Sequence, residues 1–312
     1  MNIELPRKCL DSGYLAHMIT LRCNGNCPYC IVEGRGTPYE YPELSGKDVL
    51  SIWNNLKSHN GKRLSIIGGE CTLHQDFMEI VQGLIGYNVT ITTNLATKFY
   101  DDPNFWKAFK VNYPIRVNTS YHPCSGLSPE RYVEIVNTLR KNGINVDQTG
   151  MVEYPGFDSD KWKKKFSSIG FNGIRMISFL GFWSKDGGFI NKKSMKTEMN
   201  RDNLYPKATG LDAARILREC GIDDMDRYFM QCGQPMDSNI EWNCPHGSMC
   251  FLVAPDGTVH ECHHKLYHNI DPLGNALTGF SSVEVSRICG HFGKCSWCDI
   301  PRLVRSGYKC KI

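Results

Sequence analysis

Two kinds of apolar pattern alternate along the first 180 residues of the chain. Six short apolar or β-rich segments span residues 17–21, 64–67, 89–93, 115–119, 144–152 and 174–179. Between them, apolar residues recur every three or four positions, the spacing of a helix that packs one face against a sheet. Ser45 and Ser128 begin two of these helices with a capping hydroxyl. The alternation predicts a parallel α/β unit, and six repeats favour an open or partial (β/α)6 TIM-like barrel over a closed eightfold one.

Polar and reactive residues follow the predicted strands. In parallel α/β sheets ligands bind at the carboxyl ends of the strands, so the residues that end each strand are candidates for a site. After the second, third and fourth strands these residues are Gly68, Gly69, Glu70, Asn94, Ser120, Tyr121 and His122. His122 is a candidate general acid or base beside a substrate. The alternative for each polar residue here is a loop position that bonds only to its neighbours.

The pattern changes after residue 182. Residues 183–205 are rich in Lys, Gly and Asn without a clear period, and one more helix is predicted over residues 211–220. From Cys232 onward the chain is rich in Cys, His and Gly. We therefore expect a barrel over residues 1–181, a linker and helix over 182–231, and a small Cys-rich domain over 232–312.

Composition and charge narrow the class of protein. The chain has 312 residues, 41% of them hydrophobic and 22% charged, which is typical of a globular protein with a sizeable core. No apolar run approaches the ~18 residues needed to span a bilayer. The N-terminus lacks the apolar stretch of a signal peptide, so we expect a cytoplasmic protein with no membrane partner. A net charge of +4, spread along the chain, gives no reason to expect nucleic-acid binding.

Fifteen cysteines point to metal chemistry. Thiols in a reducing compartment are usually metal ligands, redox groups or buried residues. Cys23, Cys27 and Cys30 have the spacing C-x3-C-x2-C directly after the first strand. Thiolates favour zinc or an iron–sulfur cluster, and structural zinc requires a fourth ligand that is absent nearby. Three thiolates on a [4Fe–4S] cluster leave one iron open; a zinc half-site or three coincidental thiols are the alternatives.

These residues resemble the radical S-adenosylmethionine (SAM) superfamily. Its cysteine motif carries an aromatic residue before the last cysteine, here Tyr29, and its second mark is a GGE-like turn, here Gly68-Gly69-Glu70. Cys71 stands where the family usually has proline. The resemblance implies a partial barrel over about residues 15–180 that binds a [4Fe–4S] cluster and SAM. It also implies a 5′-deoxyadenosyl radical that abstracts a substrate hydrogen, and an external one-electron reductant of the flavodoxin or ferredoxin type.

Positions around SAM follow from the same resemblance. The two glycines let the backbone approach a ligand closely, and the Glu70 carboxylate can receive the methionine ammonium. Asn94 can reach the ribose or the carboxylate of SAM, and Ser120 ends the next strand as a further candidate for cofactor binding.

The C-terminal cysteines form a second set. A hairpin with a Pro-Asp-Gly turn is predicted to bring together Cys244 and Cys262, and Cys295 and Cys298 add a C-x2-C pair. Four thiolates suit either zinc or [4Fe–4S]. The spacing resembles the shorter twitch form of the SPASM appendage of radical enzymes, which implies one auxiliary [4Fe–4S] cluster. Cys250 and Cys289 are alternative ligands, and Cys289 with Cys310 can support a second cluster.

The resemblance favours hydrogen abstraction from a small polar metabolite of sugar, aminocyclitol or amino-acid type, giving epimerisation or dehydrogenation. Only about 15 residues precede the first strand, which favours such a metabolite over a peptide, so a peptide-modifying enzyme is the alternative. Epimerisation needs a thiol hydrogen donor. The candidates are Cys71, Cys124, Cys232 and Cys250, with Cys250 or Cys232 preferred. Outside this class, a zinc-stabilised binding protein and a two-cluster electron carrier leave Gly68-Gly69-Glu70 or the barrel unexplained.

Overall fold

A ten-stranded sheet organises the molecule. The computed structural model describes residues 14–25, 27, 30, 41–56, 61–153, 157–178, 181–183, 189–191, 243–244, 250–281 and 287–288. Its first six strands are β1 (Tyr14–Thr20), β2 (Arg63–Gly68), β3 (Asn88–Thr93), β4 (Ile115–Tyr121), β5 (Asn145–Glu153) and β6 (Arg175–Ser178). They are adjacent in chain order and all parallel. The predicted six-stranded parallel unit, and with it the partial barrel, is confirmed.

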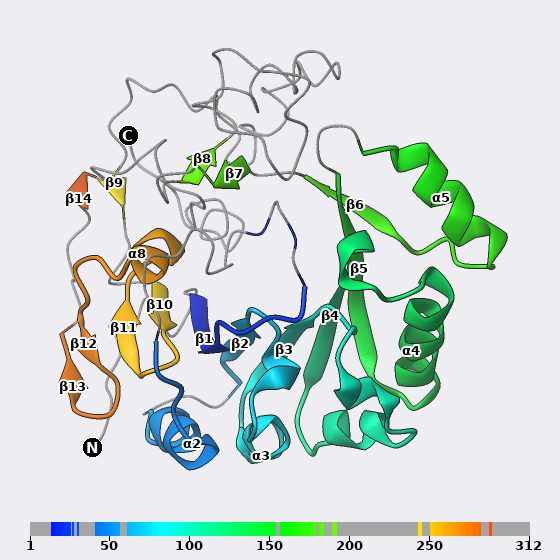
Figure 1. The fold of residues 1–312 in the computed structure, drawn as a ribbon. Coiled ribbons are helices and arrows are strands. Elements are labelled where there is room, and N and C mark those ends of the chain that lie inside the picture. The colour runs from blue at the N-terminus through cyan, green and yellow to red at the C-terminus, as the bar shows by residue number, and fades with distance from the viewer. Residues whose placement is uncertain are drawn as a thin grey trace.

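Helices cover the outer face of these strands (Figure 1). They are α2 (Gly46–Asn54), α3 (Phe77–Gly83), α4 (Pro129–Lys141) and α5 (Ser159–Ser168), with the 3-10 turns η1 (Cys71–Leu73), η2 (Lys98–Asp101), η3 (Phe105–Phe109) and η4 (Pro123–Ser125). Ser45 and Ser128 cap α2 and α4 as predicted, because their side chains accept from the backbone N–H three residues on. No helix of the described part of the chain is long and apolar enough to cross a bilayer.

The C-terminal strands extend the same sheet. They are β10 (Cys250–Val253), β11 (Thr258–His260), β12 (Gly274–Asn275) and β13 (Gly279–Phe280). β10 pairs in parallel with β1 on the side away from β2, and β11, β12 and β13 follow by antiparallel pairing. The predicted hairpin is therefore present as β10–β11. The predicted boundary at residue 232 does not separate two sheets, because residues 250–280 complete the sheet of the barrel.

Short strands occur outside this sheet. β7 (Gly181–Trp183) pairs with β8 (Phe189–Asn191), and β9 (Asn243–Cys244) pairs with β14 (Arg287–Ile288), both antiparallel. The remainder of the predicted linker and the predicted helix over 211–220 lie outside the described residues.

A second apolar cluster lies on the other face of the sheet. It contains Ala16 and Met18 of β1, Leu252 of β10, and Leu266 and Tyr267 of α8 (His263–His268). The alternate residues of β1 and β10 belong to the outer core with α2 to α5. Since successive side chains of a strand point to opposite faces, α8 covers the inner face of β1 and β10.

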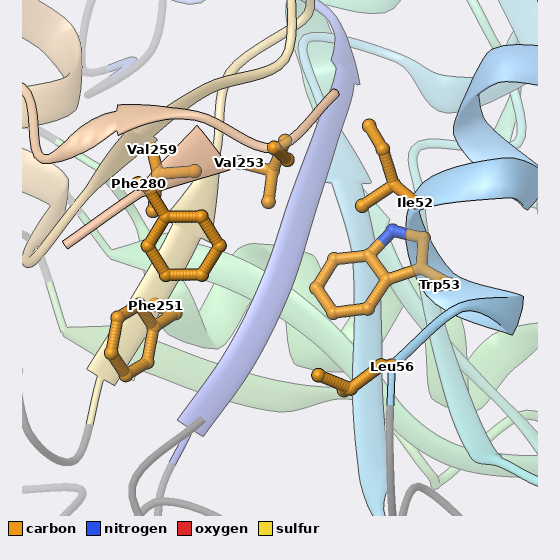
Figure 2. A pocket seen from close by; sticks show the side chains of 8 residues that line it. Ile52, Trp53, Leu56, Phe251, Val253, Val259 and Phe280 are labelled. Atoms are coloured by element: carbon orange, nitrogen blue, oxygen red, sulfur yellow. The ribbon is translucent and has the colours of Figure 1, made fainter. Parts of the chain in front are cut away.

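An apolar cavity marks the junction of α2 with the C-terminal strands. Its volume is about 20 Å³, and Figure 2 shows side chains of α2, β10, β11 and β13 around it. The lining residues are Ile52, Trp53, Leu56, Phe251, Val253, Val259, Ala276 and Phe280. A cavity of this size has room for about one water molecule, and apolar walls offer that water no partners. It is a gap in packing and not a substrate site.

Candidate functional site

The segment that carries Cys23, Cys27 and Cys30, called the cysteine loop below, follows the carboxyl end of β1. Cys27 is buried, whereas Cys23 and Cys30 are partly exposed. The backbone N–H of Cys30 donates to the Cys27 carbonyl at 2.9 Å, and the N–H of Gly25 donates to Cys23 Sγ at 3.4 Å. A Cβ atom placed on Gly25 would lie 3.4 Å from Cys27 Sγ and 3.6 Å from Cys23 Sγ, so both sulfurs border one small space. Tyr29 lies outside the described residues.

Asn94, at the end of β3, holds this loop. Its Nδ2 lies 2.9 Å from Asn24 Oδ1 and 3.7 Å from Cys23 Sγ, and its Oδ1 accepts from the N–H of Ala96 at 2.8 Å. Asn24 in turn donates to the Ala96 carbonyl at 2.8 Å. The structure therefore brings Asn94 to the cysteines, as its position at a strand end suggested. Its contact with SAM stays a prediction.

Glu70 is fully buried between the ends of β2 and β3. Its Oε1 accepts from the N–H of Thr72 at 3.2 Å and from the hydroxyls of Thr72 and Thr93 at 2.6 and 2.8 Å. Its Oε2 accepts from the N–H of Asn94 at 2.6 Å. Burial raises the pKa of this carboxyl, while the four donors act in the opposite direction. In the structure, the hydrogen bonds of Glu70 connect the ends of β2 and β3. Its predicted contact with the methionine ammonium stays a prediction.

The two glycines of the turn are required by packing against the chain itself. A Cβ on Gly68 would lie 2.4 Å from the Thr20 carbonyl oxygen, and one on Gly69 would lie 2.3 Å from that of Arg22. The N–H groups of Gly69 and Glu70 donate to these same two carbonyls at 2.9 and 2.8 Å. On the side where a Cβ would stand, the backbone that leads into the cysteine loop fills the space. The predicted contact of the two glycines with SAM stays a prediction.

The end of β4 and the turn after it carry three of the candidate side chains. Ser120 Oγ lies 2.9 Å from His122 Nε2, and desolvation lowers the pKa of His122 to about 4, so this imidazole is neutral at pH 7. The exposed Cys124 of η4 lies with its Sγ 3.3 Å from Cys27 Sγ. Contact with Cys124 and burial both raise the pKa of the Cys27 thiol. The turn after β4 therefore brings Cys124 to Cys27, which sequence analysis did not foresee. The predicted roles of Ser120 and His122 at the site stay predictions.

An arginine–glutamate pair fastens the base of the loop and was missed by sequence reasoning. Arg22 donates to both carboxylate oxygens of Glu43 at 2.7 Å and to the Leu73 carbonyl at 2.9 Å. Burial alone would raise the pKa of Glu43, but the hydrogen bonds from Arg22 and Thr20 hold it below its ordinary value. Its position next to Cys23 was the only feature of the sequence that could have indicated this role of Arg22.

Cys250 and Cys262 lie at the other end of the sheet. Cys250 pairs in register with Tyr14, the first residue of β1, whereas the cysteine loop follows Thr20, the last. These ends are about 20 Å apart along the strand. Cys262 follows β11 at the same end as Cys250, because His260 pairs with Leu252. This register argues against Cys250 as a hydrogen donor at the barrel mouth.

The remaining C-terminal predictions are largely untested by the structure. For Cys244 the structure describes the backbone in β9. Cys232, Cys295 and Cys298 lie outside the described residues. The auxiliary cluster and its twitch-like domain therefore stay predictions.

The thiols of the loop are ligands of the kind that hold an iron–sulfur cluster. Within the described ranges, no three His, Cys, Asp or Glu side chains are placed to hold one metal ion. A [4Fe–4S] cluster is held by thiolates that each bind a different iron, so its ligands are more widely spread than those of zinc. Cys23, Cys27 and Cys30 supply three such thiols on one loop, and the Gly25 and Asn94 N–H groups already point at one of them.

Part of the chain matches a known protein family. Residues 18–164 match the Radical SAM superfamily. The chain is 32% identical over 201 residues to a GTP 3',8-cyclase of Psychromonas ingrahamii, a match that covers 61% of this chain and 59% of that protein. It is 25% identical over 265 residues to a probable GTP 3',8-cyclase of Methanothermobacter thermautotrophicus, covering 78% and 82%. The chain thus spans less than two thirds of the Psychromonas cyclase.

Two solved structures share the fold. Native anSMEcpe with bound AdoMet superposes with a TM-score of 0.51 at 15% identity, covering 86% of this chain and 79% of that chain. SuiB of Streptococcus suis bound to precursor peptide SuiA gives a TM-score of 0.51 at 14% identity, covering 86% and 63%. At these identities the likeness concerns the fold alone.

Proposed function

We propose, from the premise that residues 18–164 are a radical SAM domain, that the protein binds a [4Fe–4S] cluster through Cys23, Cys27 and Cys30 and reductively cleaves SAM. One observation carries the proposal. The ends of β1, β2, β3 and β4 meet at the cysteine loop, through Asn94 to Cys23 and Asn24 and through Cys124 to Cys27. When bound, the cluster supplies the electron that converts SAM to methionine and a 5′-deoxyadenosyl radical.

The residues of the chain position that chemistry. Asn94 and Asn24 fix the start of the loop against β3, and the Arg22–Glu43 pair fixes its base. Glu70 holds the ends of β2 and β3 at a constant separation, because it is bonded to both. Preorganised groups of this kind let a site hold its cofactor without rearrangement. An external one-electron reductant of the flavodoxin or ferredoxin type is needed to begin each turnover.

The inner face of the sheet supports a polar substrate. The strand positions that alternate with the outer core carry polar side chains that are partly or fully exposed, among them Thr92, Ser120, Gln148 and Arg175. Polar groups on a concave face give orientation to a ligand through hydrogen bonds. We infer a small polar metabolite of sugar, aminocyclitol or amino-acid type, which loses one hydrogen atom and is then epimerised or dehydrogenated.

A purine nucleotide is the second candidate substrate. The similarity to GTP 3',8-cyclases supports this candidate, since the Psychromonas protein is 32% identical over 201 residues. A nucleotide triphosphate requires cationic side chains at its phosphates. Arg175 is an exposed cation on β6 in register with Gly150, where the neighbouring strand has no side chain.

The test is anaerobic reconstitution followed by assay of 5′-deoxyadenosine. The protein with dithionite and SAM is expected to form 5′-deoxyadenosine, and Cys27→Ala is expected to lose this activity. Cys71→Ala is the matched control, because the Cys71 thiol lies in the core and donates to the Thr92 carbonyl at 3.3 Å. Absence of 5′-deoxyadenosine from a protein that contains the cluster would contradict the proposal.

The substrate is identified by a panel in D2O. Sugars, aminocyclitols, amino acids, GTP and short peptides are each offered under the same conditions. Deuterium uptake without net oxidation indicates epimerisation, and loss of two electrons indicates dehydrogenation. Conversion of GTP alone would show that the substrate is a purine nucleotide and not a sugar, aminocyclitol or amino acid. Reaction of peptides alone would exclude both of these candidate substrates.

A further inference from the structure

Cys124 touches a predicted cluster ligand from a different part of the fold. It belongs to η4, the turn that follows β4, and its Sγ lies 3.3 Å from Cys27 Sγ. The backbone fixes the turn, since the N–H of Ser125 donates to the His122 carbonyl at 2.9 Å. The Ser125 hydroxyl adds a second bond to the same carbonyl at 2.7 Å, so its loss leaves the backbone bond in place. Tyr121, just before the turn, donates to the Leu127 carbonyl at 3.0 Å. The contact of the two sulfurs is thus set by the end of β4.

The chemistry of an iron-bound cysteine decides which of the two sulfurs donates the hydrogen bond. In the cluster-free protein either thiol can donate its S–H to the other sulfur. A cysteine that binds iron does so as a thiolate, which has no proton to donate. With the cluster bound, Cys27 can only accept and Cys124 is the donor.

We propose that Cys124 is a hydrogen-bond donor to the cluster ligand Cys27 and raises the reduction potential of the [4Fe–4S] cluster. The inference rests on the proposed function, because it requires that cluster on Cys23, Cys27 and Cys30. Hydrogen bonds to cluster sulfurs are among the features that set the potential. A donor withdraws charge from the thiolate and so favours the reduced cluster, which carries one more negative charge.

A comparison within the loop supports this role. Cys23 Sγ has two donors nearby, the Gly25 N–H at 3.4 Å and the Asn94 amide at 3.7 Å, both from segments that also shape the loop. The donor to Cys27 comes from η4, a separate turn that follows β4. Cys124 can therefore be changed with less effect on the loop than Gly25 or Asn94. It is a positioning residue and not a ligand.

The experiment compares four proteins after anaerobic reconstitution: wild type, Cys124→Ala, Cys124→Ser and Ser125→Ala. Iron and sulfide are counted first. The midpoint potential is then measured by EPR-monitored redox titration, following the signal that changes when SAM is added, which separates this cluster from any auxiliary one. Cys124→Ser keeps a donor, and Ser125→Ala removes a hydrogen bond of the same turn that does not involve Cys27.

We expect Cys124→Ala to bind a full cluster whose reduction equilibrium is about tenfold less favourable, a shift of about 59 mV to lower potential for one electron. Cys124→Ser should stay closer to wild type, and Ser125→Ala should equal wild type. Equal potentials in wild type and Cys124→Ala would overturn the inference. So would equal shifts in the Ala and Ser variants, which a structural role alone would produce.

Two further outcomes separate this inference from the proposed function. If Cys124→Ala loses iron in proportion to one cluster while Cys124→Ser keeps it, Cys124 acts in cluster assembly and the tuning role is wrong. If the wild-type protein takes up no cluster that responds to SAM, the proposed function and the inference both fail. A midpoint that is unchanged in a fully loaded Cys124→Ala protein removes the inference and leaves the proposed function standing.

Discussion

Glu70 joins the ends of β2 and β3 because both of its carboxylate oxygens are enclosed by donors of the chain itself. The GGE turn was predicted from the sequence, and its place next to the cysteine loop agrees with that prediction. The internal use of its carboxylate was not foreseen, because a local motif does not reveal which remote donors a side chain meets. Thr93 and Asn94 follow Glu70 by more than twenty residues in the chain.

Glu70→Ala should be strongly destabilising. It leaves the buried N–H groups of Thr72 and Asn94 without their acceptor, and a buried donor left unpaired costs about 1–3 kcal/mol. We expect the free energy of unfolding to fall by roughly 3 kcal/mol or more, measured by urea denaturation. Glu134→Ala on the exposed face of α4 is the control and should change it by no more than about 0.5 kcal/mol. Similar effects of the two substitutions would refute the internal role of Glu70.

His17 makes the stability of the fold depend on acid. The imidazole is fully buried in β1 and accepts from Trp53 Nε1 at 3.0 Å, and desolvation lowers its pKa from 6.5 to about 3. Between these two values the unfolded chain binds a proton that the folded protein does not. The contribution of neutral His17 to the free energy of unfolding is therefore complete above pH 6.5 and is lost as the pH falls toward about 3.

The pH dependence of His17→Gln should be shallower than that of wild type. Once the pH is well below 6.5, one proton taken up only by the unfolded chain lowers the free energy of unfolding by about 1.4 kcal/mol per pH unit. Denaturant titrations at neutral and mildly acid pH compare the two proteins, and titrating groups common to both cancel in the difference. Parallel pH dependences would mean that His17 is protonated equally in the folded and unfolded states.

At the scale of elements, the alternating pattern predicted the six barrel strands and their helices because each buries one face locally. The pattern carries no information on which distant strands pair. The pairing of β10 with β1, and hence the position of Cys250 at the amino end of β1, therefore had to come from the structure. The contact of Cys124 with Cys27 was hidden for the same reason, since it joins two loops that meet only in the folded sheet.

Gly69→Ala should displace the cysteine loop. The new Cβ would lie 2.3 and 2.5 Å from the carbonyl oxygens of Arg22 and Leu21, and backbone at such a distance has to move. We expect iron incorporation on reconstitution to fall severalfold while the far-ultraviolet circular dichroism spectrum is kept. The control is Gly173→Ala, where the nearest atom is the end of a phenylalanine ring at 3.3 Å. Full iron incorporation in Gly69→Ala would show that the loop tolerates the shift.

At the scale of the whole molecule, the barrel and the C-terminal strands form one structural unit. Phe251 of β10 packs against Phe280 with ring centroids 5.6 Å apart and lines the cavity opposite Trp53 of α2 (Figure 2). Residues far apart in the chain therefore share one core. Loss of packing in β10 should therefore destabilise β1 as much as β10 itself.

Phe251→Ala should cost about 3–5 kcal/mol, because it enlarges an existing cavity in the core. Hydrogen exchange followed by mass spectrometry should show that peptides from Tyr14–Thr20 and Cys250–Val253 lose protection together. Phe171→Ala, which removes a ring packed on Phe166 near the other edge of the sheet, is the matched control and should leave these two peptides coupled and protected. Loss of protection confined to β10 would mean that the two regions unfold separately.

The pairing of β1 with β10 also has a consequence for synthesis on the ribosome. β1 ends at Thr20, whereas β10, the strand that pairs with its free edge, begins only at Cys250 and is therefore synthesised much later. Closing so long a loop is slow, and a strand edge left open in the meantime is a site for association with other chains. Until β10 has been synthesised, the nascent barrel carries its cysteine loop on an edge strand that lacks its final neighbour.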